Sequence, residues 1–132
     1  FKKNISINYQ NDGKSEYLIN GIENRIEQII ANLLDNSISF SDDGSEVIVN
    51  VSNGLEKKVI VKILDEGQGF KEKDTSKIFN RFYSNRPENF GEHSGLGLNI
   101  VKNLVELHDG KIEASNRLDK QGALIEIKFP SL

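Results

Sequence analysis

The feature that most constrains this chain is a long apolar stripe between Ile22 and Phe40. Counted from its first member, apolar side chains recur at offsets of 4, 7, 8, 11 and 12 residues, at Ile22, Ile26, Ile29, Ile30, Leu33 and Leu34. This spacing puts them on one face of an α-helix, which repeats about every 3.6 residues. A helix with one apolar face must bury it against another layer, so the chain must build a layered core.

Alternating, β-branched patterns on both sides of this helix predict strands. Before the helix, the pattern lies within Phe1–Gln10 and briefly at Tyr17–Ile19. After it, strands are predicted at Glu46–Val51 and Lys57–Leu64, joined by a hairpin turn at Asn53-Gly54.

A second amphipathic stripe, from Leu98 to His108, predicts another helix. Two strands follow it, at Lys111–Asn116 and Ala123–Phe129, around a turn at Asp119–Gly122. This order of elements predicts an α+β fold, with helices on one face of a mixed sheet.

The segment Asp65–Ser94 follows neither period. It is about thirty residues long and rich in glycine and polar residues, with one apolar cluster at Ile78-Phe79 and Phe82-Tyr83. Loops of this length are uncommon in compact domains and are usually functional or mobile.

Composition limits the classes of function. The 132 residues suit one domain, and 17 basic against 20 acidic residues give a net charge of −3, which argues against sequence-independent nucleic-acid binding. With no cysteine and two histidines, the chain offers no disulfide, thiol nucleophile or His-based zinc site. It has no methionine, even at position 1, so we expect a piece of a longer protein.

A polar stripe runs along the first helix at spacings of three and four residues, through Arg25, Gln28, Asn32, Asn36 and Ser39. It is either a solvated face or a binding face. Asparagine is a mediocre helix former, and its neutral carbonyl oxygen can ligate Mg²⁺ while phosphates supply the charge.

Two glycine-rich segments are either ordinary turns or ligand sites. Asp65–Gly69 directly follows a predicted strand, and its glycines allow a ligand to approach the backbone closely. Gly91–Leu98 leads into the second helix, where free backbone N–H groups can bind an anion. Neither is a Rossmann fingerprint or a Walker A loop, and the H-R-D and D-F-G signatures of protein kinases are absent.

Four segments, in order, resemble the N, G1, F and G2 boxes of the catalytic, ATP-binding domain of bacterial sensor histidine kinases: Asn32–Asn36, Asp65–Gly69, Ile78–Tyr83 and Gly95–Leu98. Gly122 resembles the final glycine box. The resemblance covers essentially all of residues 1–132 as a single domain. It implies the Bergerat ATP-binding fold of the GHKL superfamily, a two-layer α/β sandwich with roughly five strands covered on one face by about three helices.

The resemblance also implies an activity, which is to bind Mg-ATP and transfer its γ-phosphoryl group to a histidine. Asn36 would be the catalytic residue and Mg²⁺ ligand, with Asn32 one turn earlier, and Asp65 would accept the adenine amino group, as an acceptor-only carboxylate suits. The other ATP-binding residues that it implies are Ser39, Phe40, Gly67, Gly69, Phe79, Arg86, Ser94, Gly95, Leu96, Gly97 and Leu98.

The stretch from about Asn80 to Ser94 would form the ATP lid, anchored by Phe79 and Phe82. Arg86 would be the lid cation that reaches the phosphates. For Phe79, a place in the buried core is the alternative.

Asn32 separates the chain from related ATPases. In gyrase-like ATPases and anti-sigma serine kinases a glutamate at this position acts as general base, and Asn32 cannot take a proton. This favours transfer to histidine. A degenerate module that binds nucleotide only to regulate a partner stays open as well, because Ser39 stands where many members have Lys or Arg. Ala123, where many have Ser or Thr, is a second departure.

Neither histidine suits the acceptor role, since His93 falls in the lid and His108 ends the second helix. The expected partners are ATP and ADP, the dimerisation and histidine phosphotransfer domain of the parent chain and, indirectly, a response regulator, with no nucleic acid. We expect an isolated monomer that, in its parent, is the cytoplasmic domain of an inner-membrane-anchored kinase.

Overall fold

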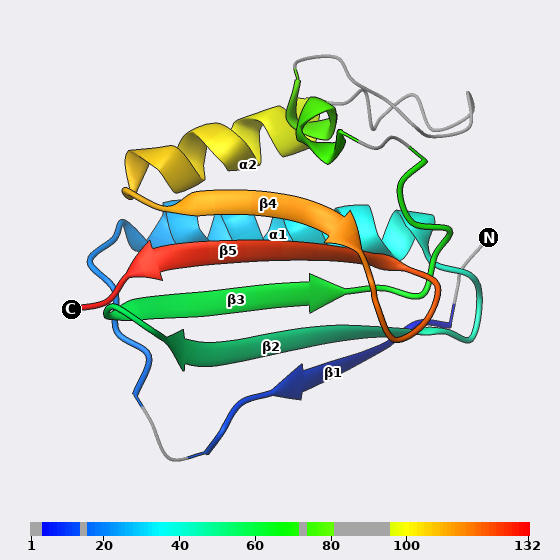
Figure 1. The fold of residues 1–132 in the computed structure, drawn as a ribbon, viewed down its shortest axis with the longest axis horizontal. Coiled ribbons are helices and arrows are strands. Elements are labelled where there is room, and N and C mark those ends of the chain that lie inside the picture. The colour runs from blue at the N-terminus through cyan, green and yellow to red at the C-terminus, as the bar shows by residue number, and fades with distance from the viewer. Residues whose placement is uncertain (1–3, 14–15, 72–73, 81–95) are drawn as a thin grey trace.

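The computed structural model describes residues 4–13, 16–71, 74–80 and 96–132. The strands are β1 (Ser6–Gln10), β2 (Glu46–Gly54), β3 (Lys58–Leu64), β4 (Lys111–Asn116) and β5 (Ala123–Pro130); the helices are α1 (Glu23–Phe40), the short 3-10 helix η1 (Thr75–Phe79) and α2 (Leu96–Leu107). One sheet in the order β1-β2-β3-β5-β4 forms the first layer, and α1 and α2 cover one of its faces (Figure 1). The predicted α+β sandwich is confirmed.

The sheet is mixed because β1 and β2 run parallel while the other neighbours are antiparallel. Parallel neighbours need a long crossover, and here α1 lies in the connection between them. The central strands alternate strictly, so that β3 and β5 send every second side chain into the core. On the open face, Lys62 and Glu126 lie opposite each other, with the ammonium and carboxylate 3.7 Å apart.

Helix α1 begins and ends as its sequence predicts, with Ile29 and Leu33 fully buried against the sheet. At its start, His108 Nε2 accepts a hydrogen bond from the Ile22 N–H (3.1 Å), while His108 Nδ1 lies 2.8 Å from the Leu104 carbonyl. A neutral ring with its proton on Nδ1 satisfies both bonds. His108 thus joins the last turn of α2 to the first turn of α1, which is a structural role.

Two predicted details differ. The segment Tyr17–Ile19 is a single bridge from Ile19 to Ser131 rather than a strand, since only the last residues of the chain lie beside it. The predicted turn at Asn53-Gly54 is wrong, because both residues stay paired in β2 and the turn is formed by residues 55–57. Gly54 serves packing instead, since a Cβ there would lie 2.4 Å from Ile60 Cδ1.

Leu33 and Leu34 offer a matched test of this core. Leu33 is fully buried, whereas Leu34 is half-buried at the edge of the helix face. Leu33→Ala should lower the free energy of unfolding by about 2–5 kcal/mol through lost burial and a cavity. Leu34→Ala should cost less than half as much. Urea unfolding of both variants measures the difference, and equal losses would contradict the packing described.

Candidate functional site

The segments that carry the predicted site meet at one end of the sandwich. There α1 and β3 end, β5 begins and α2 begins, all at the right of Figure 1. The loop after β3 leads to η1, which packs beside the start of α2 (Figure 1). Asn99 of α2 fixes this contact, because its side-chain amide donates to the Phe79 carbonyl (3.1 Å). Segments far apart in the sequence therefore lie together at this end of the sandwich, which we call the edge of the site.

Asp65 is the buried acid of this edge. Its side chain follows β3 and is 3% exposed. Oδ1 accepts hydrogen bonds from the N–H groups of Gly67 (2.9 Å) and Ala123 (3.0 Å). Burial raises the pKa of the Asp65 carboxyl above its ordinary 3.8, while these two bonds and the charge of Arg117 oppose the rise. No described residue donates to Oδ2, so this oxygen remains able to accept from a ligand.

Gly67 brings the loop after β3 against the end of α1. A Cβ on Gly67 would lie 2.5 Å from the Phe40 carbonyl oxygen, too close for any side chain. The structure thus places Phe40 beside Asp65 and Gly67, although they are more than twenty residues apart in the sequence. This contact joins the predicted G1 box to the end of α1, the helix that carries the predicted N box.

The polar stripe of α1 is solvated only at its beginning. Arg25 is exposed, whereas Asn32, Asn36 and Ser39 are half-buried. The Ser39 hydroxyl donates to the Asn36 carbonyl (2.9 Å), within the helix. The half-buried part of the stripe lies toward the end of α1 that contacts Gly67.

Gly97 and Leu98 lie in the first turn of α2, which begins two residues before the apolar stripe that predicted it. Gly97 is exposed, and a Cβ there would meet no atom of the described residues within 4 Å, while Leu98 packs against the core. Leu96 begins the helix. The predicted lid residues 81–94, with Arg86, Ser94 and also Gly95, lie outside the described residues.

Phe79 occupies the core, as its alternative interpretation proposes. Its side chain is 4% exposed and belongs to the same apolar cluster as Ile78 and Val101. Phe79 anchors η1 to α2, so Phe79 would influence nucleotide binding through the position of α2.

Sequence reasoning predicted the turn between β4 and β5 but missed the contacts that the residues at its start make with the loop after β3. Asn116 and Arg117 both bind the backbone of the loop after β3, at Phe70 and Asp65. Lys120 pairs with Glu66 (3.0 Å), whose other oxygen accepts from the Glu46 N–H. The only sequence signal was a cluster of polar residues directly after a strand, which is ordinary for turns.

The described residues contain no group of three His, Cys, Asp or Glu side chains that could hold a metal alone. A half-buried amide oxygen such as that of Asn36 suits Mg²⁺ only if other oxygens complete its shell. Mg²⁺ usually keeps several waters and binds through substrate phosphates, so this donor chemistry fits a nucleotide-bound Mg²⁺.

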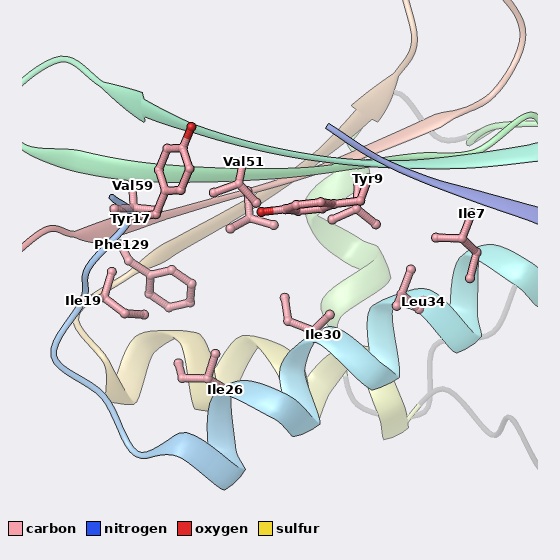
Figure 2. A pocket seen from close by; sticks show the side chains of 12 residues that line it. Ile7, Tyr9, Tyr17, Ile19, Ile26, Ile30, Leu34, Val51, Val59 and Phe129 are labelled. Carbon is pink, nitrogen blue, oxygen red and sulfur yellow. The ribbon is translucent and has the colours of Figure 1, made fainter. Parts of the chain in front are cut away.

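A separate groove of about 480 Å³ lies between α1 and the β1–β2 side of the sheet (Figure 2). Ile7, Tyr9, Ile30 and Leu34 point into it. Its lining is entirely aliphatic and aromatic, and two tyrosine hydroxyls are its only polar side-chain groups. Its lining contains no charged side chain to pair with phosphates, so we place the candidate nucleotide site at the other end of α1 instead.

Comparison with known proteins decides the family. Residues 21–132 match the family described as "Histidine kinase-, DNA gyrase B-, and HSP90-like ATPase". The chain belongs to this family. It is 38% identical over 135 residues to the "Sensor protein ChvG" of Agrobacterium fabrum, and the matched region covers 97% of this chain and 22% of that protein. It is 32% identical over 112 residues to the "Sensor histidine kinase WalK" of Bacillus subtilis, covering 82% of this chain and 18% of that protein.

Solved structures in the family have the same fold. The "Mycobacterial sensor histidine kinase MprB" has a TM-score of 0.82 at 26% identity, covering 96% of this chain and 81% of that chain. The full-length ShkA structure, solved in complex with AMPPNP, has a TM-score of 0.79 at 25% identity, covering 96% of this chain and 25% of that chain. These matches confirm the predicted ATP-binding domain of a sensor histidine kinase.

The chain spans about a fifth of the length of the curated relatives it matches first. Among its described residues, no helix is long and apolar enough to cross a membrane.

Gly67 and Gly97 give a matched pair of glycine substitutions. Gly67→Ala should lower the free energy of unfolding by about 1–3 kcal/mol, because the new methyl group displaces the Phe40 carbonyl. Gly97→Ala, in the open first turn of α2, should leave stability unchanged or raise it by up to about 1 kcal/mol. Thermal and urea unfolding measure both. A neutral Gly67→Ala would contradict the contact between the loop and α1.

Asp65→Asn should change how stability depends on pH. Because burial raises the pKa of Asp65, the folded state holds this proton more tightly than the unfolded chain. The free energy of unfolding therefore falls as pH rises from 3.8 through the raised pKa. The asparagine side chain does not titrate, so this fall is absent in the variant. The free energy of unfolding of Asp65→Asn should therefore rise relative to that of the unaltered protein as pH increases across that window.

Urea unfolding at steps between about pH 3.5 and 7 measures the difference between the two proteins. Other carboxylates titrate in both and cancel. A difference that stays constant over this range would show that Asp65 is not the group responsible.

Proposed function

We propose that this domain binds Mg-ATP and passes its γ-phosphoryl group to a histidine on the dimerisation domain of the parent chain, as one domain spanning residues 1–132. The observation that carries the proposal is Asp65, a buried acid at the edge where the predicted boxes meet, with one oxygen held by two backbone N–H groups. Membership of the ATPase family supports it further.

Asp65 and its loop would bind the base. With Oδ1 fixed, Oδ2 is positioned to accept from the adenine amino group, and guanine would present an acceptor oxygen there instead. The Phe40 carbonyl lies against Gly67 at the same end of the sandwich, and the Phe40 ring would stack on the base. A buried, charge-assisted hydrogen bond of this kind gives selectivity as well as affinity.

The other end of the site would hold the phosphates. Backbone N–H groups in the first turn of α2, at Leu96, Gly97 and Leu98, point toward the helix start, where the helix dipole favours anions. Asn36 would ligate Mg²⁺, with Asn32 one turn earlier on the same half-buried face. Bound there, Mg²⁺ offsets negative charge on the phosphates. Ser39, Arg86, Ser94 and Gly95 stay assigned to this end as predictions.

The identity of residue 32 favours histidine as the acceptor. Asn32 cannot activate water or a serine hydroxyl as a general base. An imidazole is already a nucleophile and needs less help from this domain. Both ring nitrogens of His108 are engaged in hydrogen bonds, to the Ile22 N–H and the Leu104 carbonyl, so the acceptor histidine would lie on another domain. A response regulator would receive the phosphoryl group later. The isolated domain would be a monomer. Within the parent protein, the domain would be cytoplasmic and linked to the membrane through other parts of that chain.

Phosphotransfer to a separately supplied dimerisation domain tests this proposal. With ATP and Mg²⁺, the chain should label that domain on histidine, giving an acid-labile, base-stable product, and should hydrolyse ATP negligibly alone. Asn36→Ala should abolish labelling by removing the Mg²⁺ ligand. Asn32→Glu should add slow hydrolysis by supplying a carboxylate in the general-base position.

Radiolabelled ATP with acid and base treatment of the product distinguishes the outcomes. Rapid hydrolysis by the lone domain, or acid-stable phosphate on a serine, would move the chain to another branch of its family. Nucleotide binding with no transfer at all would favour a purely regulatory module.

A further inference from the structure

We propose that Asn116, the last residue of β4, and Arg117, which follows it, are positioning residues that hold the loop at the base end of the nucleotide site. This inference rests on the function proposed above. Neither residue belongs to the segments that carry the family resemblance, yet both bind the backbone of the loop that contains Asp65 and Gly69.

Asn116 binds Phe70 as a neighbouring strand would. Its Oδ1 accepts from the Phe70 N–H (2.6 Å), and its Nδ2 donates to the Phe70 carbonyl (3.1 Å). One side chain thus satisfies both backbone groups of a residue that lies in no helix or strand.

The same side chain explains the second glycine of the loop. Gly69 has a φ of +81°, and a Cβ there would lie 2.6 Å from Asn116 Oδ1. The loop can approach Asn116 this closely only because residue 69 has no side chain. Gly69 and Asn116 therefore fit each other.

Arg117 holds the other end of the loop. Its side chain is 4% exposed, and its Nη1 donates to the Asp65 carbonyl (3.1 Å). Nε and Nη2 bind both carboxylate oxygens of Asp119, at 3.0 and 2.8 Å, which fixes the guanidinium plane. Gly122 leaves room for this arrangement, since a Cβ there would lie 2.0 Å from the backbone carbonyl oxygen of Asp65 and 3.0 Å from Arg117 Cδ.

These contacts act on the base end alone. They fix the backbone on both sides of Gly67 and hence the direction of the Asp65 carboxylate, but they do not reach Asn36 or the first turn of α2. Loosening them should weaken nucleotide binding and adenine preference without changing the chemical step at saturating ATP. A merely structural role would lower the melting temperature but leave the affinity of the folded protein unchanged.

Calorimetry with Mg-ADP and Mg-GDP, at a temperature where every variant is folded, tests the inference. Asn116→Ala should weaken Mg-ADP binding about tenfold, corresponding to about 1.4 kcal/mol, and reduce the preference over Mg-GDP. Arg117→Met should do the same, and Arg117→Lys, which keeps one donor, should recover part of the loss. Asn53→Ala is the matched control, because Asn53 is an exposed asparagine at the opposite end of the sheet and should change affinity less than about twofold.

In the phosphotransfer assay, the ATP KM of Asn116→Ala should rise by a similar factor while kcat stays within about twofold. Unchanged Mg-ADP affinity in both Asn116→Ala and Arg117→Met, or a fall in kcat with KM unchanged, would overturn the inference and leave the proposed function standing. If the unaltered chain binds no adenine nucleotide, the proposed function fails first and the inference fails with it.

Discussion

The buried carboxylate of Asp65 is the interaction on which the rest of this site depends. Its Oδ1 accepts from the N–H groups of Gly67 and Ala123, so one oxygen joins the end of β3, the loop that follows and the start of β5. Burying a carboxylate is costly unless its hydrogen bonds are made, and a well-packed apolar residue would stabilise the fold at least as well. An acid is retained there, where it can bind a ligand.

The surroundings of Asp65 are shaped by backbone packing directly on backbone. Gly67 lies against the Phe40 carbonyl and Gly122 against the Asp65 carbonyl, both at distances that no side chain allows. Such contacts pack the backbone densely around Asp65, at the end of the sandwich where α2 also begins (Figure 1). The function proposed above would use this arrangement, with the base bound by fixed hydrogen bonds and the phosphates by backbone N–H groups at the start of α2.

Much of the fold could be predicted from local patterns. The 3.6-residue and two-residue periods located α1, α2 and most strands, because the faces they define must be buried wherever the chain places them. The failures had local causes. Residues 53 and 54 have the composition of a turn, but their pairing with β3 keeps them in β2. Phe79 could have contacted a ligand or the core, and only the position of α2 decided between them.

The sequence by itself determined the elements, their order and the chemical types available to the site: an acid after a strand, glycines beside it and asparagines on one helical face. Only the tertiary structure decided that Gly67 packs against the Phe40 carbonyl, and that Asn116 and Arg117 bind the backbone of the loop after β3. The physical reason is sequence distance. Periodicity reports contacts within one element, whereas a carbonyl satisfied by a side chain fifty-two residues away leaves no periodic signal in either segment.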